Sequence, residues 1–185
     1  MIKKRKRKPV VNNQKILMNF RMMKRLVPLY RELLGDPKQL KIFFGQFRNS
    51  IFDTTQSKEF KSGFISFRAR QAKLTSNVKL VEDHVVRRIH GVEYLFQLLN
   101  EDSRITYRTF KKHLKLVGQK VLLTSEEHKL VNEVTKGNNT PNFEVYKSLN
   151  FDIVGTNFRG RTKNWDKFVY TNLLPVYQKL GLFVK

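Results

Sequence analysis

The most restrictive feature of the sequence is a helix start that directly follows a β-prone run. Residues 119–123 favour a strand, and Thr124 comes next as an N-cap residue. Glu127 stands three residues after Thr124, and this spacing is that of a capping box, in which each side chain binds the backbone N–H of the other residue. Apolar residues beginning at Leu130 continue the helix to an expected end near Gly137. The sequence therefore predicts a strand that passes directly into a helix.

Apolar periodicity predicts helices over much of the remaining chain. Between residues 16 and 34 the apolar positions recur close to every 3.6 residues, as in an amphipathic helix, and Pro28 is expected to bend it. The opposite face of this helix carries four cations that face either solvent or DNA: Arg21, Lys24, Arg25 and Arg31. Further helices are expected at residues 40–51, 94–99, 110–116 and 165–174, and a polar loop at residues 53–61. The apolar side chains of Phe64, Ile65 and Phe67 are expected in the core rather than on a surface that stacks bases.

The charge of the chain predicts a polyanionic partner. Lys and Arg number 37 against 15 Asp and Glu, which gives a formal net charge of +22. Double-stranded DNA is the leading interpretation, because phosphate binding releases condensed counterions; an anionic membrane surface is the alternative. No apolar stretch reaches the roughly 18 residues that a membrane-spanning helix needs, so the sequence predicts no such helix.

The chain contains no cysteine, and this absence narrows the possible chemistry. Disulfides, thiolate catalysis and cysteine-ligated zinc are excluded, so any metal must be held by His, Asp, Glu or Asn. The N-terminal residues lack the apolar segment of a secretory signal. We therefore expect an intracellular protein that is not secreted.

Two segments carry most of the cations that we expect to contact DNA. The N-terminal run of six cations should stay extended without a partner, and it is either a phosphate-binding arm or a nuclear or nucleoid address. The segment around residues 150–165 mixes glycines, aromatic residues and cations, as in a loop that contacts DNA or in a structural loop. The candidate DNA contacts are Lys3, Lys4, Arg5, Lys6, Arg7, Lys8, Arg87, Arg88, Arg159, Arg161 and Lys163.

An acid and a histidine lie side by side in a second β-prone run, at Asp83 and His84. Charged groups are costly in an apolar strand, so they require a reason. The predicted helix start places His128 in the first helical turn, and Asn132 lies four residues later on the same face. If the two strands pack on this helix, a carboxylate and an imidazole can share one divalent cation beside a second, free imidazole, which is the equipment for phosphodiester hydrolysis. The alternative is that His84 is a hydrogen-bonded residue of a strand edge and His128 a surface histidine.

This arrangement resembles the ββα-metal core of HNH (His-Me finger) endonucleases, particularly the small cysteine-free members found in phages. The resemblance rests on an Asp-His pair on one strand, a second strand, and Thr-x-x-Glu-His-x-x-x-Asn at a helix start. It implies that Asp83 and His128 bind a divalent ion, Mg²⁺ or Mn²⁺, and that His84 is the general base. It also implies that Asn132 is a further metal ligand and that Gln119, in place of the family's middle Asn, orients the base. The spacer from His84 to His128 is longer than in compact members, and the helices expected at 94–99 and 110–116 account for it.

Together these observations predict an α+β fold, mostly helical, with a small ββα-metal nuclease core and a basic N-terminal arm. The expected segments are a basic arm (1–13), a helical N-terminal region (14–75), the HNH core with its helical insertion (76–137) and a DNA-contacting C-terminal region (138–185). The predicted function is metal-dependent hydrolysis of DNA; the alternative is a non-catalytic basic protein that binds nucleic acid, RNA-associated or DNA-packaging. We expect His90, which is followed by glycine in a predicted turn, and His113 to be non-catalytic. The oligomeric state is left open.

Overall fold

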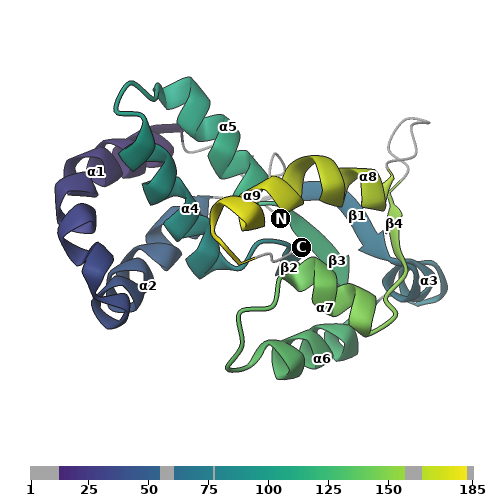
Figure 1. Ribbon diagram of the computed structural model, residues 1–185. Helices are drawn as coiled ribbons and strands as arrows, with labels where there is room; N and C mark the ends of the chain where they lie inside the picture. Colours follow the sequence, from purple (N-terminus) through teal and green to yellow (C-terminus); the bar gives the residue numbers. More distant parts are fainter. Residues whose placement is uncertain (1–12, 55–60, 77, 157–163, 183–185) are drawn as a thin grey trace, which may run out of the picture.

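The computed structural model describes residues 13–54, 61–76, 78–156 and 164–182 (Figure 1). The chain is mostly helical with one small mixed sheet, so the predicted α+β class is confirmed. The first half contains α1 (Asn13–Glu32), a 3₁₀ turn (Leu33–Gly35), α2 (Pro37–Asp53), β1 (Lys61–Ser66), α3 (Phe67–Thr75), β2 (Val81–His84) and α4 (Arg88–Glu101). The second half contains α5 (Tyr107–Val117), β3 (Lys120–Leu123), α6 (Ser125–Thr135), α7 (Asn142–Ser148), β4 (Ile153–Gly155), α8 (Trp165–Phe168), a π-helical turn (Val169–Leu173) and α9 (Leu174–Lys179).

The four strands lie in the order β2-β3-β1-β4. β2 pairs with β3 in antiparallel register, with His84 opposite Lys120, while β3 runs parallel to β1 and β4 antiparallel to β1. β1 was not predicted and lies in the segment that we expected to be helical. The strand is irregular: Gly63 adopts a φ of 79°, and the register with β3 shifts between Lys61 and Phe64. A glycine inside a strand weakens the sequence pattern that would predict it.

The buried side chains of β1 explain why this strand is central. Phe64 and Ile65 are buried, as expected for core residues. Phe67 is 46% exposed, so its predicted place in the core is wrong. The reason is that the strand ends at Ser66, whose hydroxyl accepts from the Ala69 N–H and begins α3, which turns the next side chain outward.

The helices α1, α2, α4 and α5 form a layer beside the sheet, and α4 is its centre (Figure 1). α1 and α2 both pack on α4 through aromatic rings: the Phe96 centroid lies 4.9 Å from that of Phe43 and 5.5 Å from that of Tyr30. One hydrophobic cluster joins these helices to the strands and to α9. The expected helices at the N-terminus and in the insertion are therefore present, and they share one core with the sheet. None of the described helices is long and apolar enough to cross a membrane.

The predicted turn at His90 and Gly91 is wrong, because both residues lie inside α4. Gly91 is needed there for space rather than for a turn. A Cβ built on Gly91 would lie 2.5 Å from the Phe52 ring and 3.3 Å from Val117 Cβ, so α4 can approach α2 only without a side chain at this position. The Phe52 ring in turn packs edge-on against the His84 ring, with centroids 5.2 Å apart.

The predicted capping box at the start of α6 is present, and it is tied to the rest of the fold. The Thr124 hydroxyl accepts from the Glu127 N–H, and Glu127 Oε2 accepts from the Thr124 N–H at 2.8 Å. The same carboxylate oxygen accepts from the Ser66 hydroxyl at 2.7 Å. Glu127 thus links the starts of α3 and α6 and holds α6 against the sheet. The helix ends at Thr135, and Gly137 follows with a φ of 78°, close to the expected end.

Gly91→Ala is expected to destabilise the protein, whereas Gly45→Ala should stabilise it slightly. The first methyl group collides with Phe52 in a packed core, which should cost about 1–3 kcal/mol of unfolding free energy. The second lies in the interior of α2 with nothing within 4 Å, so the helix propensity of alanine should add about 0.5–1 kcal/mol. Urea unfolding of the two variants measures both values. Equal effects of the two substitutions would contradict the close approach of α4 and α2.

Candidate active site

Asp83 and His128 meet where the end of β2 contacts the first turns of α6. The Nε2 atom of His128 lies 3.6 Å from Oδ1 of Asp83, and α6 packs directly on β2. Asn132 is one helical turn beyond His128, with its Nδ2 atom 3.3 Å from Nδ1 of the ring. The structure thus brings these three predicted residues together. The register places Val81, at the start of β2, opposite Leu123, at the end of β3, so α6 begins near the start of β2. α6 then packs back on β2, and His128 in its first turn reaches Asp83.

His84 lines the same cavity as Asp83 and His128, although adjacent strand residues point to opposite faces. This is possible because β2 is an edge strand that ends at His84. The imidazole is buried against Phe52, and its Nδ1 atom has no hydrogen-bond partner within the described parts of the chain. Burial, together with the nearby cations Lys120 and Arg88, lowers the pKa of His84 to about 3. The ring is therefore neutral at physiological pH, as a proton acceptor must be.

The second carboxylate oxygen of Asp83 is held by two residues of α7. Oδ2 accepts a hydrogen bond from the Tyr146 hydroxyl and one from the Asn142 amide at 3.3 Å. The same Asn142 amide nitrogen donates to the His84 carbonyl at 2.7 Å. Burial raises the pKa of Asp83, and the hydrogen bonds and His128 oppose that rise. These contacts leave Oδ1 as the oxygen that faces His128.

The sequence analysis did not identify Asn142 and Tyr146, the two residues of α7 that bind Asp83. The only sequence signal is their spacing of four residues, which places two polar side chains on one face of a helix. That helix is too short for a clear periodic pattern, and its partner in the structure, Asp83, lies far away in the sequence.

Gln119 does not make the contact with the His84 ring that we expected. Its side-chain amide donates to the Lys115 carbonyl at 2.7 Å, and its backbone carbonyl accepts from the Val85 N–H at 3.0 Å. The strand register explains this, since Lys120 and not Gln119 is paired with His84. The orienting role predicted for Gln119 is therefore corrected: its backbone tethers the segment after β2, and its side chain closes the end of α5.

The residues predicted to contact DNA fall into three groups in the structure. The six cations between Lys3 and Lys8, and the three at Arg159, Arg161 and Lys163, lie outside the described residues. Arg87 has a structural task instead, because its guanidinium donates to the carbonyls of Thr135 and Asn138 and so ties the start of α4 to the end of α6. Arg88 is exposed and lines the cavity that contains His84.

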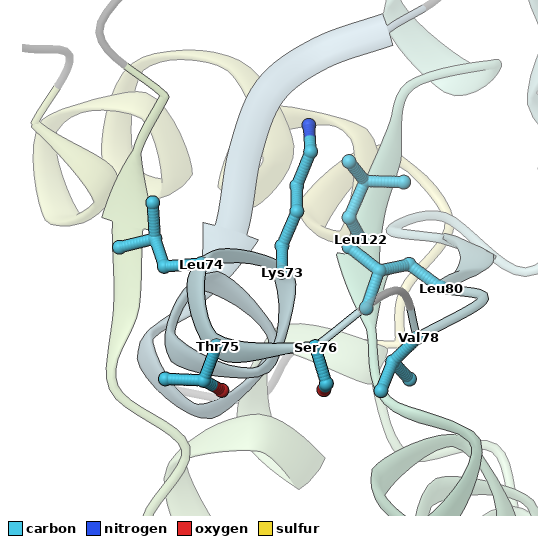
Figure 2. A pocket seen from close by; sticks show the side chains of 7 residues that line it. All are labelled: Lys73, Leu74, Thr75, Ser76, Val78, Leu80 and Leu122. Carbon is cyan, nitrogen blue, oxygen red and sulfur yellow. The ribbon is translucent and has the colours of Figure 1, made fainter.

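The cavity around Asp83 has a volume of about 890 Å³ and is lined by β2, α6 and the loop after it, α4 and α2. A second hollow of about 540 Å³ lies at the end of α3, where Lys73, Leu74 and Leu80 are among the lining residues (Figure 2). That hollow contains neither a carboxylate nor an imidazole among its lining residues. Acid–base or metal chemistry is therefore expected only in the larger of these two cavities.

The donor atoms at Asp83 and His128 suit a divalent cation that keeps most of its water. Ligand atoms about 2.0–2.2 Å from one ion lie roughly 3–4 Å apart, and the observed 3.6 Å falls in that range. The Asn132 amide contacts Nδ1 of His128, whereas Nε2 is the nitrogen that faces Asp83, so this arrangement does not show Asn132 as a ligand of an ion held between Nε2 and Oδ1. The described residues contain no cluster of three or more His, Cys, Asp or Glu able to hold a metal. A site with few protein ligands fits Mg²⁺ or Mn²⁺ better than a structural zinc ion.

Comparison with protein-family models, with curated proteins and with solved structures gave no match.

Tyr146→Phe is expected to raise the pKa of Asp83 further and to lower the unfolding free energy by about 1–3 kcal/mol, because the variant removes a donor from a buried carboxylate. Tyr177→Phe is the matched control, since this buried hydroxyl donates to the Val85 carbonyl at 3.3 Å and not to Asp83. Carboxyl ¹³C NMR titration and urea unfolding report the two effects. A shift of the Asp83 pKa in both variants, or in neither, would contradict the hydrogen bond from the Tyr146 hydroxyl to Asp83.

The pH dependence of stability should reveal the buried His90. Burial, with a contribution from Arg87, lowers its pKa to about 4, whereas in the unfolded chain it is near 6.5. As the pH falls from 7.5 to 5, only the unfolded chain takes up this proton, so the folded state loses about 1–2 kcal/mol. His90→Gln should show a correspondingly smaller loss in urea unfolding at these two pH values. Identical losses in the variant and in the unmodified protein would mean that His90 titrates normally.

Proposed function

We propose that this protein is a metal-dependent endonuclease that hydrolyses DNA phosphodiester bonds, with β2, β3 and α6 as a ββα-metal core of the HNH type. The observation that carries the proposal is the 3.6 Å approach of Asp83 and His128, with a neutral His84 lining the same cavity. A carboxylate and an imidazole that share one side of a cavity suit a cation, and a neutral imidazole beside them suits a base.

In the proposed reaction His84 removes a proton from the attacking water. Nδ1 is buried and has no hydrogen-bond partner in the part of the chain that the structure describes, so Nε2 is proposed as the nitrogen that accepts this proton. The water oxygen forms a bond to phosphorus while the bond to the 3′ oxygen breaks, and the departing oxygen takes a proton from solvent. Asp83 and His128 would hold a divalent ion, which supplies charge neutralisation at the scissile phosphate and the leaving oxygen. Tyr146 and Asn142 keep Asp83 oriented throughout.

Double-stranded DNA is the proposed substrate, and an intracellular location follows from it. The net charge of +22 suits a polyphosphate, which repays a dense positive field by counterion release. A non-catalytic nucleic-acid-binding protein would explain the charge equally well, and the lack of a third acidic or histidine ligand among the described residues favours it. It leaves without a role the buried Asp83 and the Nδ1 atom of His84, which has no hydrogen-bond partner among the described residues, and we therefore prefer the nuclease.

The test is nicking of supercoiled plasmid with Mg²⁺ or Mn²⁺ and with a chelator. His84→Ala should lower the cleavage rate by about 10²–10⁴-fold with DNA affinity nearly unchanged, because a general base contributes to the reaction and not to binding. His113→Ala is the control, since its ring bonds the Tyr94 hydroxyl at 2.8 Å and does not line the cavity. Asp83→Asn should lower the rate and raise the metal concentration needed for half-maximal cleavage. Full activity of His84→Ala, or cleavage that survives chelation, would overturn the proposal.

A further inference from the structure

α2 forms the wall of the large cavity that faces α6. Residues from both the start and the end of this helix line the cavity, including Lys41 and Arg48. Figure 1 shows α2 to the left of β2 and α6 below it, and residues of both helices line the cavity. The helix is held in this place by the packing of Phe43 and Phe44 on α4, and these rings lie on the buried side of α2. Phe44 also lines the cavity, and Lys41 and Arg48 lie beside it on the same face of α2 with exposed side chains, so a ligand in the cavity can reach both cations.

Two of the three cations of α2, Lys41 and Arg48, lie on one face of the helix. Lys41 and Arg48 are seven residues apart, so they lie two turns apart, or about 10 Å along the axis. Both side chains are exposed, and neither has an ion-pair partner within the described ranges. Lys120, by contrast, is paired with Glu82 at 3.0 Å. The cations of α2 therefore offer charge that the fold itself does not use.

The charge in the cavity is distributed asymmetrically. The lining residues from α6, the following loop and α7 include His128, Asn132, Asn138 and Asn142, and no lysine or arginine is among them. All the lysines and arginines that line the cavity come from α2 or from Arg87 and Arg88. Arg87 is engaged by carbonyl groups, whereas Arg88 is exposed and near enough to His84 to lower the pKa of that ring.

Acidic groups do not cancel this asymmetry. The acidic lining residues are Glu82, Asp83 and Glu93. Glu82 is neutralised by Lys120, and Asp83 is the proposed metal ligand. Glu93 is partly buried, and burial raises its pKa. The α2 side of the cavity thus remains positive.

We propose that Lys41, Arg48 and Arg88 form a phosphate-binding wall, which holds the DNA backbone beside the scissile bond on the side away from α6. This inference rests on the proposed nuclease function and assigns the substrate contacts of the same site. Lysine and arginine contacts to phosphate position a duplex without reading its sequence. A cavity of about 890 Å³ has the size of a site for a small ligand, so it takes one short stretch of backbone while the rest of the duplex lies outside.

The experiment measures binding of a fluorescent random-sequence duplex by the His84→Ala protein between about 50 and 200 mM KCl. The double substitution Lys41→Gln, Arg48→Gln should reduce the slope of log affinity against log salt by about 2, and affinity at low salt should fall for all sequences. The control is Arg108→Gln, Lys112→Gln, which removes two exposed cations of α5 that do not line the cavity. This control should leave the slope nearly unchanged. Far-ultraviolet circular dichroism and urea unfolding verify that both double variants fold.

Equal slopes for the two double variants would overturn the phosphate-binding wall. This outcome is distinguishable from failure of the nuclease proposal, because binding is measured in a protein that lacks the proposed base. If the unmodified protein does not nick plasmid but the salt slope falls by about 2 in the α2 double variant alone, the phosphate-binding wall is supported and the catalytic proposal is contradicted. If the unmodified protein nicks plasmid and the two double variants have equal salt slopes, only the proposal of the phosphate-binding wall is contradicted.

Discussion

The burial of the Asp83 carboxylate is the constraint on which the rest of the site depends. Only 8% of this residue is exposed, and a carboxylate in such a place needs donors that water can no longer supply. Tyr146 and Asn142 provide them from α7, while His128 approaches from α6. Two helices that follow one another in the chain are therefore anchored at the end of a single strand. The Arg87 guanidinium strengthens this junction, because it binds carbonyls at and beyond the end of α6.

Burial shifts the pKa values of the neighbouring Asp83 and His84 in opposite directions. It raises the pKa of the Asp83 carboxyl, whereas it lowers the pKa of the His84 imidazole to about 3. A carboxylate that is costly without a cation and a histidine that stays uncharged then lie next to each other in one cavity. Separate environments for adjacent titratable groups are typical of sites where one group binds charge and the other moves a proton. This pairing is the physical basis for proposing metal-assisted hydrolysis.

The outer parts of the molecule set the shape of the cavity. α2 is held by aromatic packing on α4, and the close approach of these helices depends on Gly91. Phe52 at the end of α2 also contacts the His84 ring, so one helix both encloses the proposed base and carries two of the cations proposed to bind the substrate. The N-terminal helices are thus part of the site. Residues of α1, α2 and α4 and of the strands belong to one hydrophobic cluster.

Local signals in the sequence determined most of the longer helices, the capping box at Thr124 and the place of His128 in the first turn of α6, because capping and periodicity act between residues a few positions apart. The meeting of Asp83 with His128 was also predictable, since it needs only two paired strands and the helix that follows. The tertiary structure alone decided the roles of Tyr146, Arg87 and the cations of α2. Their partners lie far away in the sequence, and a hydrogen bond or a cavity wall depends on how packed elements are placed in space. The failed prediction for Gln119 has the same cause, because one step of strand register decides which side chain faces His84.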